Sequence, residues 1–385
     1  MSADLHTRYA AVVEVLPAVL HDGLLARIPQ VTRFDSGFGL GGLSLLLLSR
    51  YRVLEQQADW NAARQVAWKC LEGIIDPDRP GGTSLIEYCE VAQFLRTHAT
   101  ALELEDVVNE VLPILDGLIE QRMEQCFAAG NLDPYTGAFN PALYLLLNLP
   151  GAHRLRDSWL PHLPTATELA QHDAKGQYQI PSGISHGLAF YTYFVAQYLQ
   201  RYPQDQAFGA LGFDYLQALE LRQSSQGDPS CFYQDGGENG PGRLSLAYGD
   251  CGILFAGYRL ATVIGEVQRA DHFLNCLEQT ALRRSVDSTG ITSDNLLYGR
   301  SGAWLFFQRL HELSGRQAFA EAAAYWRQQL GDSFATSTGT LPQYPVYDYG
   351  AMKSFSLFEG AIGPPLAAYA IASDPSFLYQ LFYLQ

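Results

Sequence analysis

The chain has 385 residues, of which 48% are hydrophobic and 12% aromatic, so it carries enough apolar side chains for a large folded core and is not expected to be disordered. Its formal net charge of −15 argues against nucleic acid as a partner, because phosphate binding needs clustered Lys and Arg. The six cysteines form no CxxC pair, no signal peptide is visible in MSADLHTRYA, and no apolar run is long enough to span a bilayer. We therefore expect a cytoplasmic protein with free thiols and no membrane span.

Helical periodicity runs along most of the chain. In residues 104–127, LEDVVNEVLPILDGLIEQRMEQCF, apolar residues recur at intervals of three and four, as they do on one face of a helix. Patterns typical of strands are weak throughout the sequence. The sequence therefore predicts an all-α fold.

Apolar helices are expected to begin, repeatedly, just after a glycine-containing turn, where small residues let helix ends crowd together. The spacing of roughly 40 to 60 residues is typical of helical repeats. More amphipathic helices, such as residues 57–74, lie between the turns. Seven inner and seven outer helices would close into an (α/α) toroid, and an open solenoid is the alternative. The seven turns begin at Gly39, Gly81, Gly137, His186, Tyr248, Tyr298 and Gly360.

We expect a single domain over residues 1–385, because the repeat continues on both sides of the most polar segment, residues 223–242. That segment, QSSQGDPSCFYQDGGENGPG, is predicted to be a long loop, and long loops within compact domains are often functional. A domain boundary at this place is the alternative.

Three of the turns carry longer motifs. The fourth reads PSGISHGLAF and contains His186, the fifth reads RLSLAYGDCGILFA, and the seventh reads SLFEGAIG. These resemble the G-x-x-H-G, R-x-x-W-C-Y-G-x-x-G and S-L-x-x-G-x-x-G motifs of the lanthionine synthetase C (lanthipeptide cyclase) family, and the resemblance covers the chain from about residue 35. It implies a toroid that acts on a precursor peptide in the maturation of ribosomal peptide natural products.

The positions of the family's zinc ligands carry other residues. Ala247 stands at the cysteine of the fifth motif, and Leu297 and Tyr298 stand at the cysteine and histidine of the sixth. The two aliphatic side chains have no lone pair, and a phenol is protonated near neutral pH, so we predict no metal and no other cofactor. A replacement site at His272 and Cys276 is not favoured, because their helix is expected to be an outer one.

A polar set is retained at the family's catalytic positions: Asp133, His186, Arg243 and Tyr248. The resemblance implies that His186 exchanges protons with the thiol or the enolate and that Asp133 orients the imidazole. It also implies that Arg243 stabilises an oxyanion, with Tyr248 adding a hydrogen bond. Structural roles are the alternatives: a capping histidine, a turn aspartate, an arginine that bridges loop carboxylates, and a packing tyrosine.

Three functions are open at this point. The first is a zinc-independent cyclase, in which a cysteine thiol adds to a dehydroalanine or dehydrobutyrine of the same dehydrated peptide. Tyr298 and Asp250 are expected to contact this peptide substrate. The second is a non-catalytic scaffold that binds the precursor peptide for other maturation enzymes. The third is a carbohydrate-active (α/α) barrel with two carboxylates drawn from Asp133, Asp250, Asp294 and Glu359. The retained polar set favours the first, and the lost zinc ligands favour the second.

Overall fold

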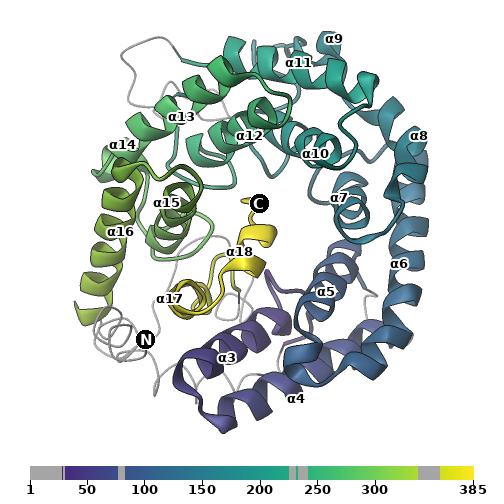
Figure 1. Ribbon diagram of the computed structural model, residues 1–385, viewed down its shortest axis with the longest axis vertical. Helices are drawn as coiled ribbons and strands as arrows, with labels where there is room; N and C mark the ends of the chain where they lie inside the picture. Colours follow the sequence, from purple (N-terminus) through teal and green to yellow (C-terminus); the bar gives the residue numbers. More distant parts are fainter. Residues whose placement is uncertain (1–27, 29–30, 77–82, 225–230, 233–241, 337–355) are drawn as a thin grey trace. The chain divides into compact units, whose positions relative to one another are not determined.

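Almost all of the regular structure in this protein is helical. Apart from one antiparallel bridge between His172 and Tyr178, the regular elements of the described residues are α- and 3-10 helices, so the predicted all-α class is confirmed. No helix in that part of the chain is long and apolar enough to cross a membrane. The computed structural model describes residues 28, 31–76, 83–224, 231–232, 242–336 and 356–385 (Figure 1).

The chain divides into two compact units, each assembled from separate stretches of sequence. Unit 1 comprises residues 1–117, 293–315 and 320–385, and unit 2 comprises residues 118–292 and 316–319. The segment 223–242 therefore lies within unit 2 and is not the place where the units divide. A single domain over residues 1–385 stays a prediction.

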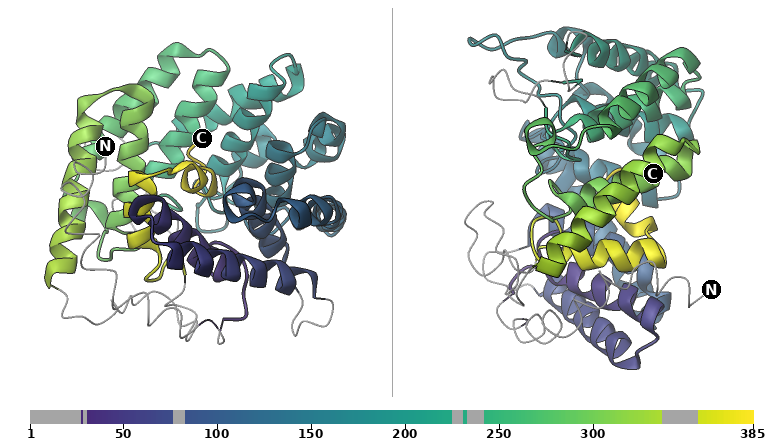
Figure 2. Two further views of the ribbon diagram at one scale, coloured as in Figure 1. Left: turned by 60° about the horizontal axis from the view of Figure 1, so that its bottom comes forward. Right: turned by 90° about the vertical axis from the view of Figure 1, so that its left-hand side faces the viewer.

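Unit 1 contains helices buried on all sides, packed against helices buried on one face. Helix α3 (Leu40–Leu54) is buried continuously from Leu40 to Ser49, whereas α4 (Gln57–Ile75) buries one face. Helix α3 packs against α4 and α17 (Gly363–Ala372), and α17 packs against α15 (Arg300–Ser314). Figure 2 shows the purple α3–α4 pair beside the yellow α17 in both views. The other helices of this unit are α5 (Leu85–His98), η2 (Thr100–Leu102) and α18 (Ser376–Leu381), and α6 (Glu105–Ala128) and α16 (Gln317–Thr336) have residues in both units.

Unit 2 repeats this arrangement. Helix α10 (Leu188–Arg201) is buried from Leu188 to Leu199 and packs against α11 (Gln206–Leu221) and α12 (Asp250–Val263), and α12 packs against the amphipathic α13 (Val267–Ala281) (Figure 1). The fully apolar helices thus follow the glycine turns, and the amphipathic ones cover them, as the sequence predicts. The remaining helices of unit 2 are α7 (Phe139–Asn148), η3 (Ala152–Leu155), α8 (Arg156–Trp159), η4 (Leu160–His162), α9 (Ala166–Leu169) and α14 (Val286–Thr289).

The glycine turns share one backbone geometry. In each of five turns, the residue after the glycine donates its N–H to the carbonyl seven residues upstream, over 2.8 to 3.1 Å. The glycine itself faces the carbonyl six residues upstream: a β-carbon on Gly187 would lie 2.0 Å from the oxygen of Pro181, and one on Gly249 would lie 1.9 Å from that of Arg243. Glycine is required here for space, because both residues have extended backbone. The five bonds are Leu40 to Arg33, Ala138 to Asn131, Leu188 to Pro181, Asp250 to Arg243, and Arg300 to Ser293.

Neighbouring turns are joined by further backbone hydrogen bonds. In unit 2, the N–H groups of Ile184 and Ser185 donate to the carbonyl of Ala247 over 2.9 and 3.2 Å. In unit 1, Leu297 donates to Phe358 over 3.0 Å and Leu357 donates to Gly37 over 2.8 Å. The turns within each unit therefore lie side by side at one end of their helices. The predicted second turn, from Gly81, begins outside the described residues, and the helix that follows begins with a capping box of Ser84 and Glu87.

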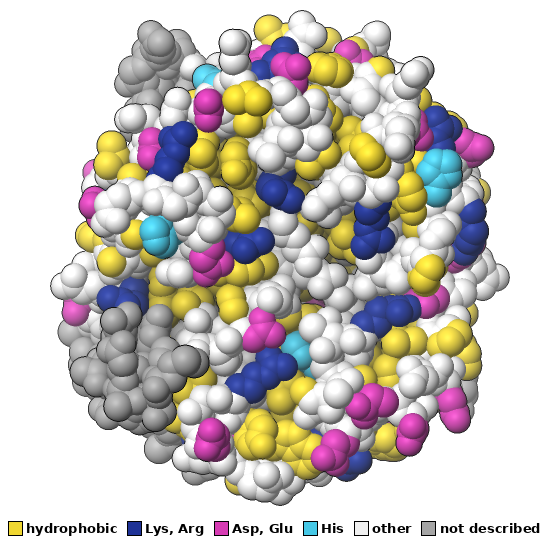
Figure 3. Space-filling view, viewed as in Figure 1, with side chains coloured by type: hydrophobic (Ala, Val, Ile, Leu, Met, Phe, Trp, Pro, Cys, Tyr) yellow, Lys and Arg dark blue, Asp and Glu magenta, His cyan; other side chains and the backbone are white. Residues whose placement is uncertain are grey.

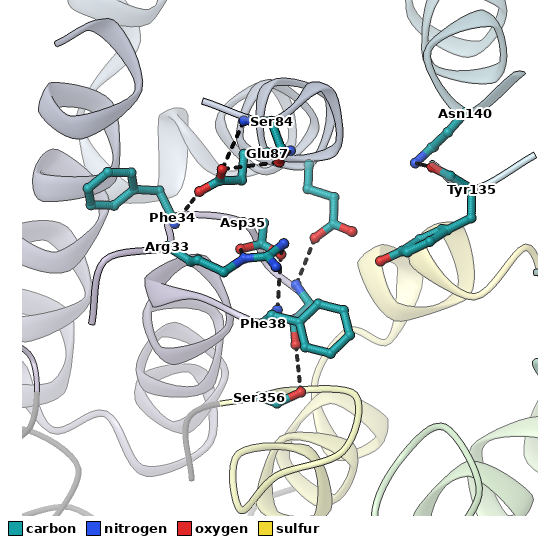
Figure 4. A network of polar contacts seen from close by, with 11 residues as sticks. Arg33, Phe34, Asp35, Phe38, Ser84, Glu87, Tyr135, Asn140 and Ser356 are labelled. Atoms are coloured by element: carbon teal, nitrogen blue, oxygen red, sulfur yellow. Dashed lines mark hydrogen bonds and ion pairs between the residues drawn. The ribbon is translucent and has the colours of Figure 1, made fainter. Parts of the chain in front are cut away.

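Buried carboxylates accept hydrogen bonds from the backbone of the first turn of unit 1 (Figure 4). Glu87 accepts the N–H of Phe34 over 3.2 Å, Glu90 accepts that of Gly37 over 2.7 Å, and Asp35 accepts that of Phe38 over 3.2 Å. Burial raises the pKa of Glu90 to about 8, and the nearby charge of Asp35 adds to the effect. These acids hold backbone N–H groups that would otherwise be unpaired.

Acidic and basic side chains are interspersed on the molecular face drawn in Figure 3, with apolar side chains between them. The described residues of that face show no continuous band of Lys and Arg.

Candidate active site

Asp133 is held by its own turn in unit 2. Its Oδ1 atom accepts the N–H groups of Tyr135 and Thr136 over 3.1 and 2.7 Å and the hydroxyl of Thr136 over 2.8 Å. An aspartate that bonds its own backbone two and three residues ahead forms an Asx turn, which the sequence DPYTG favours. Because Oδ1 takes all three of these bonds, Oδ2 is left for another donor.

His186 supplies that donor. Its Nδ1 lies 2.8 Å from Oδ2 of Asp133, and the two side chains are 33% and 30% exposed. The turn that carries His186 is fixed through Ile184 and Ser185, whose N–H groups donate to Ala247. Both members of the pair are thus positioned by glycine turns, and both keep contact with solvent. Two of the predicted catalytic residues are brought together.

The charge of Asp133 determines the tautomer of His186. Burial raises the pKa of Asp133, but the hydrogen bonds from His186 and Thr136 outweigh it and lower that pKa to about 2. An ionised carboxylate only accepts hydrogen bonds, so Nδ1 of a neutral His186 carries the proton. Nε2 then holds a lone pair, and no described residue forms a hydrogen bond with it. This nitrogen can take a proton from a bound molecule.

Two tyrosines flank the imidazole. The ring of Tyr248 stacks on His186 with centroids 5.9 Å apart and planes 19° apart, and Tyr135 meets His186 edge-on at 6.1 Å. Tyr248 is 37% exposed. The sequence predicted Tyr248, whereas Tyr135 and Thr136 were missed. The DPYTG segment held a usable signal for both, because an Asx turn fixes which residues lie next to the aspartate.

Arg243 occupies the start of the fifth turn, and its side chain is exposed. Its carbonyl accepts the N–H of Asp250 over 3.1 Å, and its aliphatic chain lies beside Gly290. The loop carboxylates that a structural Arg243 was expected to bridge, Asp235 and Glu238, lie outside the described residues. A catalytic role for Arg243 stays a prediction.

Asp250, expected to contact substrate, is fully buried. Its Oδ2 lies 2.5 Å from Nη1 of Arg283, and its two oxygens accept the N–H groups of Cys231 and Phe232 over 3.1 and 3.0 Å. Burial raises the pKa of Asp250 to about 6 against the opposing charge of Arg283. In this structure the carboxylate is occupied by protein groups, so it serves the turn and offers no free oxygen to a substrate.

The three positions that hold zinc in the family do not fit a metal ion. Ala247 is 1% exposed, and its carbonyl is already an acceptor for two N–H groups. Leu297 has no donor atom, and Tyr298 is half-buried with its N–H bonded to Asn295 over 2.8 Å. Among the described residues there is no group of three or more His, Cys, Asp or Glu that could hold a metal ion. Contact of Tyr298 with a substrate stays a prediction.

Burial also bears on the carbohydrate alternative. Asp294 is 5% exposed and forms an ion pair with Arg300 over 2.6 Å, and Asp250 is buried and paired as described above. Two of the four carboxylates considered for a glycosidase are therefore committed to internal ion pairs, whereas such an enzyme needs two carboxyl groups that reach the sugar.

The likeness to known proteins lies in the fold. No protein-family model matches the chain, and no curated protein sequence matches it. Among solved structures, a chain described as nisin cyclase matches with a TM-score of 0.70 and 14% identity, over 98% of this chain and 98% of that chain. The match shows a lanthionine synthetase C-like fold and so confirms the all-α fold class that the resemblance implies. The number of inner and outer helices, seven of each, stays a prediction.

Proposed function

We propose that this protein is a zinc-independent cyclase of dehydrated ribosomal peptides. It joins a cysteine thiol of the precursor peptide to a dehydroalanine or dehydrobutyrine of the same peptide and forms a thioether ring. The observation that carries the proposal is the Asp133–His186 pair, with Nδ1 and Oδ2 2.8 Å apart, on a fold shared with a nisin cyclase. The name of that neighbour indicates a peptide substrate.

The proton transfers follow from the tautomer of His186. Nε2 accepts the thiol proton, the sulfur attacks the β-carbon, and the electron pair of the double bond moves toward the carbonyl to give an enolate. Nε2–H then returns the proton to the α-carbon, so the ring forms without net loss of atoms. Asp133 stays ionised throughout and stabilises the imidazolium that exists between the two transfers.

No step of this mechanism involves a metal. A free thiol with a pKa of about 8.5 is a few per cent ionised at pH 7, and a neighbouring imidazole increases the population that reacts. Arg243 would stabilise the enolate oxygen, and Tyr248 would hold the substrate over the imidazole and add a hydrogen bond. These two roles belong to the proposal.

The test uses the pure protein, treated with a chelator, and a synthetic peptide with one cysteine and one dehydroalanine. Ring closure is measured as loss of free thiol at constant mass. We expect His186→Ala to slow it by about 10²- to 10⁴-fold. His172→Ala, which removes an exposed imidazole of the same unit, should retain the full rate. Closure at the wild-type rate in His186→Ala would contradict the proposal.

The second candidate function is a scaffold that binds the precursor peptide for other maturation enzymes. The loss of donor atoms at Ala247, Leu297 and Tyr298 favours it, because it removes the group that activates the thiol in the family. Tight peptide binding with no loss of thiol, in the wild-type protein and in His186→Ala alike, would identify a scaffold.

A further inference from the structure

Four of the described glycine turns share a side-chain acceptor. In each, the residue four positions before the glycine accepts, through a side-chain oxygen, the N–H of the residue directly before the glycine, over 2.7 to 3.2 Å. Such a bond closes the turn on itself, so this oxygen is committed to the backbone. Any further role of the acceptor must come from its other atoms. The four bonds are Phe38 to Asp35, Thr136 to Asp133, Tyr298 to Asn295, and Glu359 to Ser356.

The third turn differs at the residue directly before its glycine. That residue is Thr136, whose hydroxyl donates to Oδ1 of Asp133 over 2.8 Å, while its N–H donates to the same oxygen over 2.7 Å. The other three turns have phenylalanine, tyrosine and glutamate at this position. A phenyl ring and an ionised carboxyl group have no proton to donate, and the hydroxyl of a tyrosine lies far from its own backbone. Threonine is therefore the one residue type of the four that can bond the acceptor twice.

The donors around the two turn aspartates are arranged differently. Asp35 of the first turn accepts Nε of Arg33 on Oδ1 over 3.0 Å, and its Oδ2 accepts Nη2 of Arg33 and the N–H of Phe38 (Figure 4). Asp133 accepts all three donors of its own turn on Oδ1, and its Oδ2 faces Nδ1 of His186 over 2.8 Å. The third turn thus fixes one carboxylate oxygen and directs the other toward the imidazole.

The hydroxyl of Thr136 can be removed without opening the turn. It is the one donor to Oδ1 that comes from a side chain, and Thr136 is exposed. The backbone of the turn is closed independently, because the N–H of Gly137 donates to the carbonyl of Asp133 over 3.0 Å. Burial raises the pKa of Asp133, and the hydrogen bonds from His186 and Thr136 lower it to about 2. The hydroxyl therefore acts on the carboxylate and not on the core.

We propose that Thr136 is a positioning residue for the Asp133–His186 pair. Its hydroxyl holds the carboxylate so that Oδ2 faces Nδ1 of His186, which keeps the proton on Nδ1 and the lone pair on Nε2. Without the hydroxyl, Oδ1 keeps two N–H donors, and the carboxylate can rotate about its Cβ–Cγ bond. The imidazole then also adopts the tautomer with the proton on Nε2, which cannot accept a proton from a thiol. The effect on catalysis rests on the proposed cyclase function, whereas the effect on the tautomer does not.

The test compares Thr136→Val, which has nearly the same shape and no hydroxyl, with Thr136→Ser, which keeps the hydroxyl. ¹⁵N NMR of histidine-labelled protein at about pH 8.5, where imidazoles are ordinarily neutral, reports the tautomer of His186. His186→Ala identifies its signals. We expect the proton on Nδ1 in the wild type and in Thr136→Ser, and a mixture of tautomers in Thr136→Val. The kcat of ring closure should fall about tenfold in Thr136→Val at unchanged KM and recover to within about twofold of the wild type in Thr136→Ser.

Thr167→Val is the matched control, because it removes the hydroxyl of another exposed threonine in unit 2. It should change neither the tautomer of His186 nor the rate. The melting temperature of Thr136→Val should stay close to that of the wild type, so that a loss of folding does not explain the result. An unchanged tautomer in Thr136→Val, or a serine variant that behaves like the valine variant, would overturn the proposal.

The two readouts separate this proposal from the cyclase proposal. A wild-type protein that closes no ring, with a tautomer that still changes in Thr136→Val, would remove the cyclase function and support the positioning of the pair. Ring closure at the wild-type rate in Thr136→Val, with the proton still on Nδ1 of His186, would refute the role of Thr136 and leave the cyclase function standing.

Discussion

The first and third glycine turns have the same backbone geometry and different chemistry. In both, the residue after the glycine bonds the carbonyl seven residues upstream, as Leu40 does with Arg33 and Ala138 does with Asn131. Asp35 in the first turn is fully buried and paired with Arg33, whereas Asp133 in the third is 30% exposed and paired with His186. An arginine is always charged, so Arg33 has no proton to exchange near neutral pH. An imidazole can gain and lose one.

Two histidines show the same contrast. His98 of unit 1 is 1% exposed and packs against the rings of Phe94 and Phe377, and neither of its nitrogens has a hydrogen-bond partner among the described residues. Burial and the nearby charge of Arg52 lower its pKa to about 3. His186 has a carboxylate on one nitrogen and solvent near the other. The groups around a histidine thus determine whether it can take part in proton transfer, and the residue type alone does not.

The largest change in unfolding free energy is expected from substitution of the glycine that makes the turn possible. In Gly187→Ala, the new methyl group would lie 2.0 Å from the carbonyl oxygen of Pro181, so the turn must open. We expect a loss of more than about 3 kcal/mol of unfolding free energy, measured by urea denaturation. Gly209→Ala in α11, where nothing lies within 4 Å, should be neutral or stabilising. Equal losses in the two variants would refute the steric explanation.

Asp133→Asn tests the tautomer argument at almost constant shape. The N–H groups of Tyr135 and Thr136 would keep the amide oxygen, so the amide NH₂ would face Nδ1 of His186 and move the imidazole proton to Nε2. We expect ring closure at pH 7 to fall about 100-fold, with little change in the melting temperature. Asp173→Asn, at an exposed turn of the same unit, is the control and should retain activity.

Glu90→Gln tests whether the buried carboxyl group of Glu90 makes the stability of the fold depend on pH. The folded pKa of Glu90, about 8, lies above its unfolded value, so the neutral form stabilises the fold at low pH and this contribution is lost as the pH rises toward 8. A glutamine still accepts the Gly37 N–H and carries no charge. We expect the unfolding free energy of the variant to rise by roughly 4 kcal/mol relative to that of the wild type between pH 5 and pH 9 in denaturation experiments. Exposed Glu110→Gln should show no such trend.

The smallest expected change in unfolding free energy comes from substitution of His98. Its folded pKa is below the unfolded value near 6.5, so its stabilising contribution is complete above pH 6.5 and is lost as the pH falls. His98→Leu removes the titrating group. When the pH falls from 7.5 to 5.5, the unfolding free energy of the variant should therefore decrease by about 1 kcal/mol less than that of the wild type. His172→Leu serves as the exposed control. Parallel curves for wild type and His98→Leu would show that His98 is not buried as a neutral base.

The sequence by itself determined the helical class, the places where the apolar helices begin, and the positions of Asp133 and His186 in their motifs. These features are local: helical periodicity and glycine turns depend on residues close together in the chain. The reason for the glycines was only partly foreseen, since in five of the turns the glycine lies against a backbone carbonyl of its own turn.

The tertiary structure decided which polar residues are available for chemistry. Asp250 and Asp133 both sit beside glycine turns, yet Arg283 and the backbone at Cys231 take up Asp250, while Asp133 keeps an oxygen for His186. Burial and ion pairing depend on residues far apart in the chain, so no local pattern can show which carboxylate is consumed internally and which stays free.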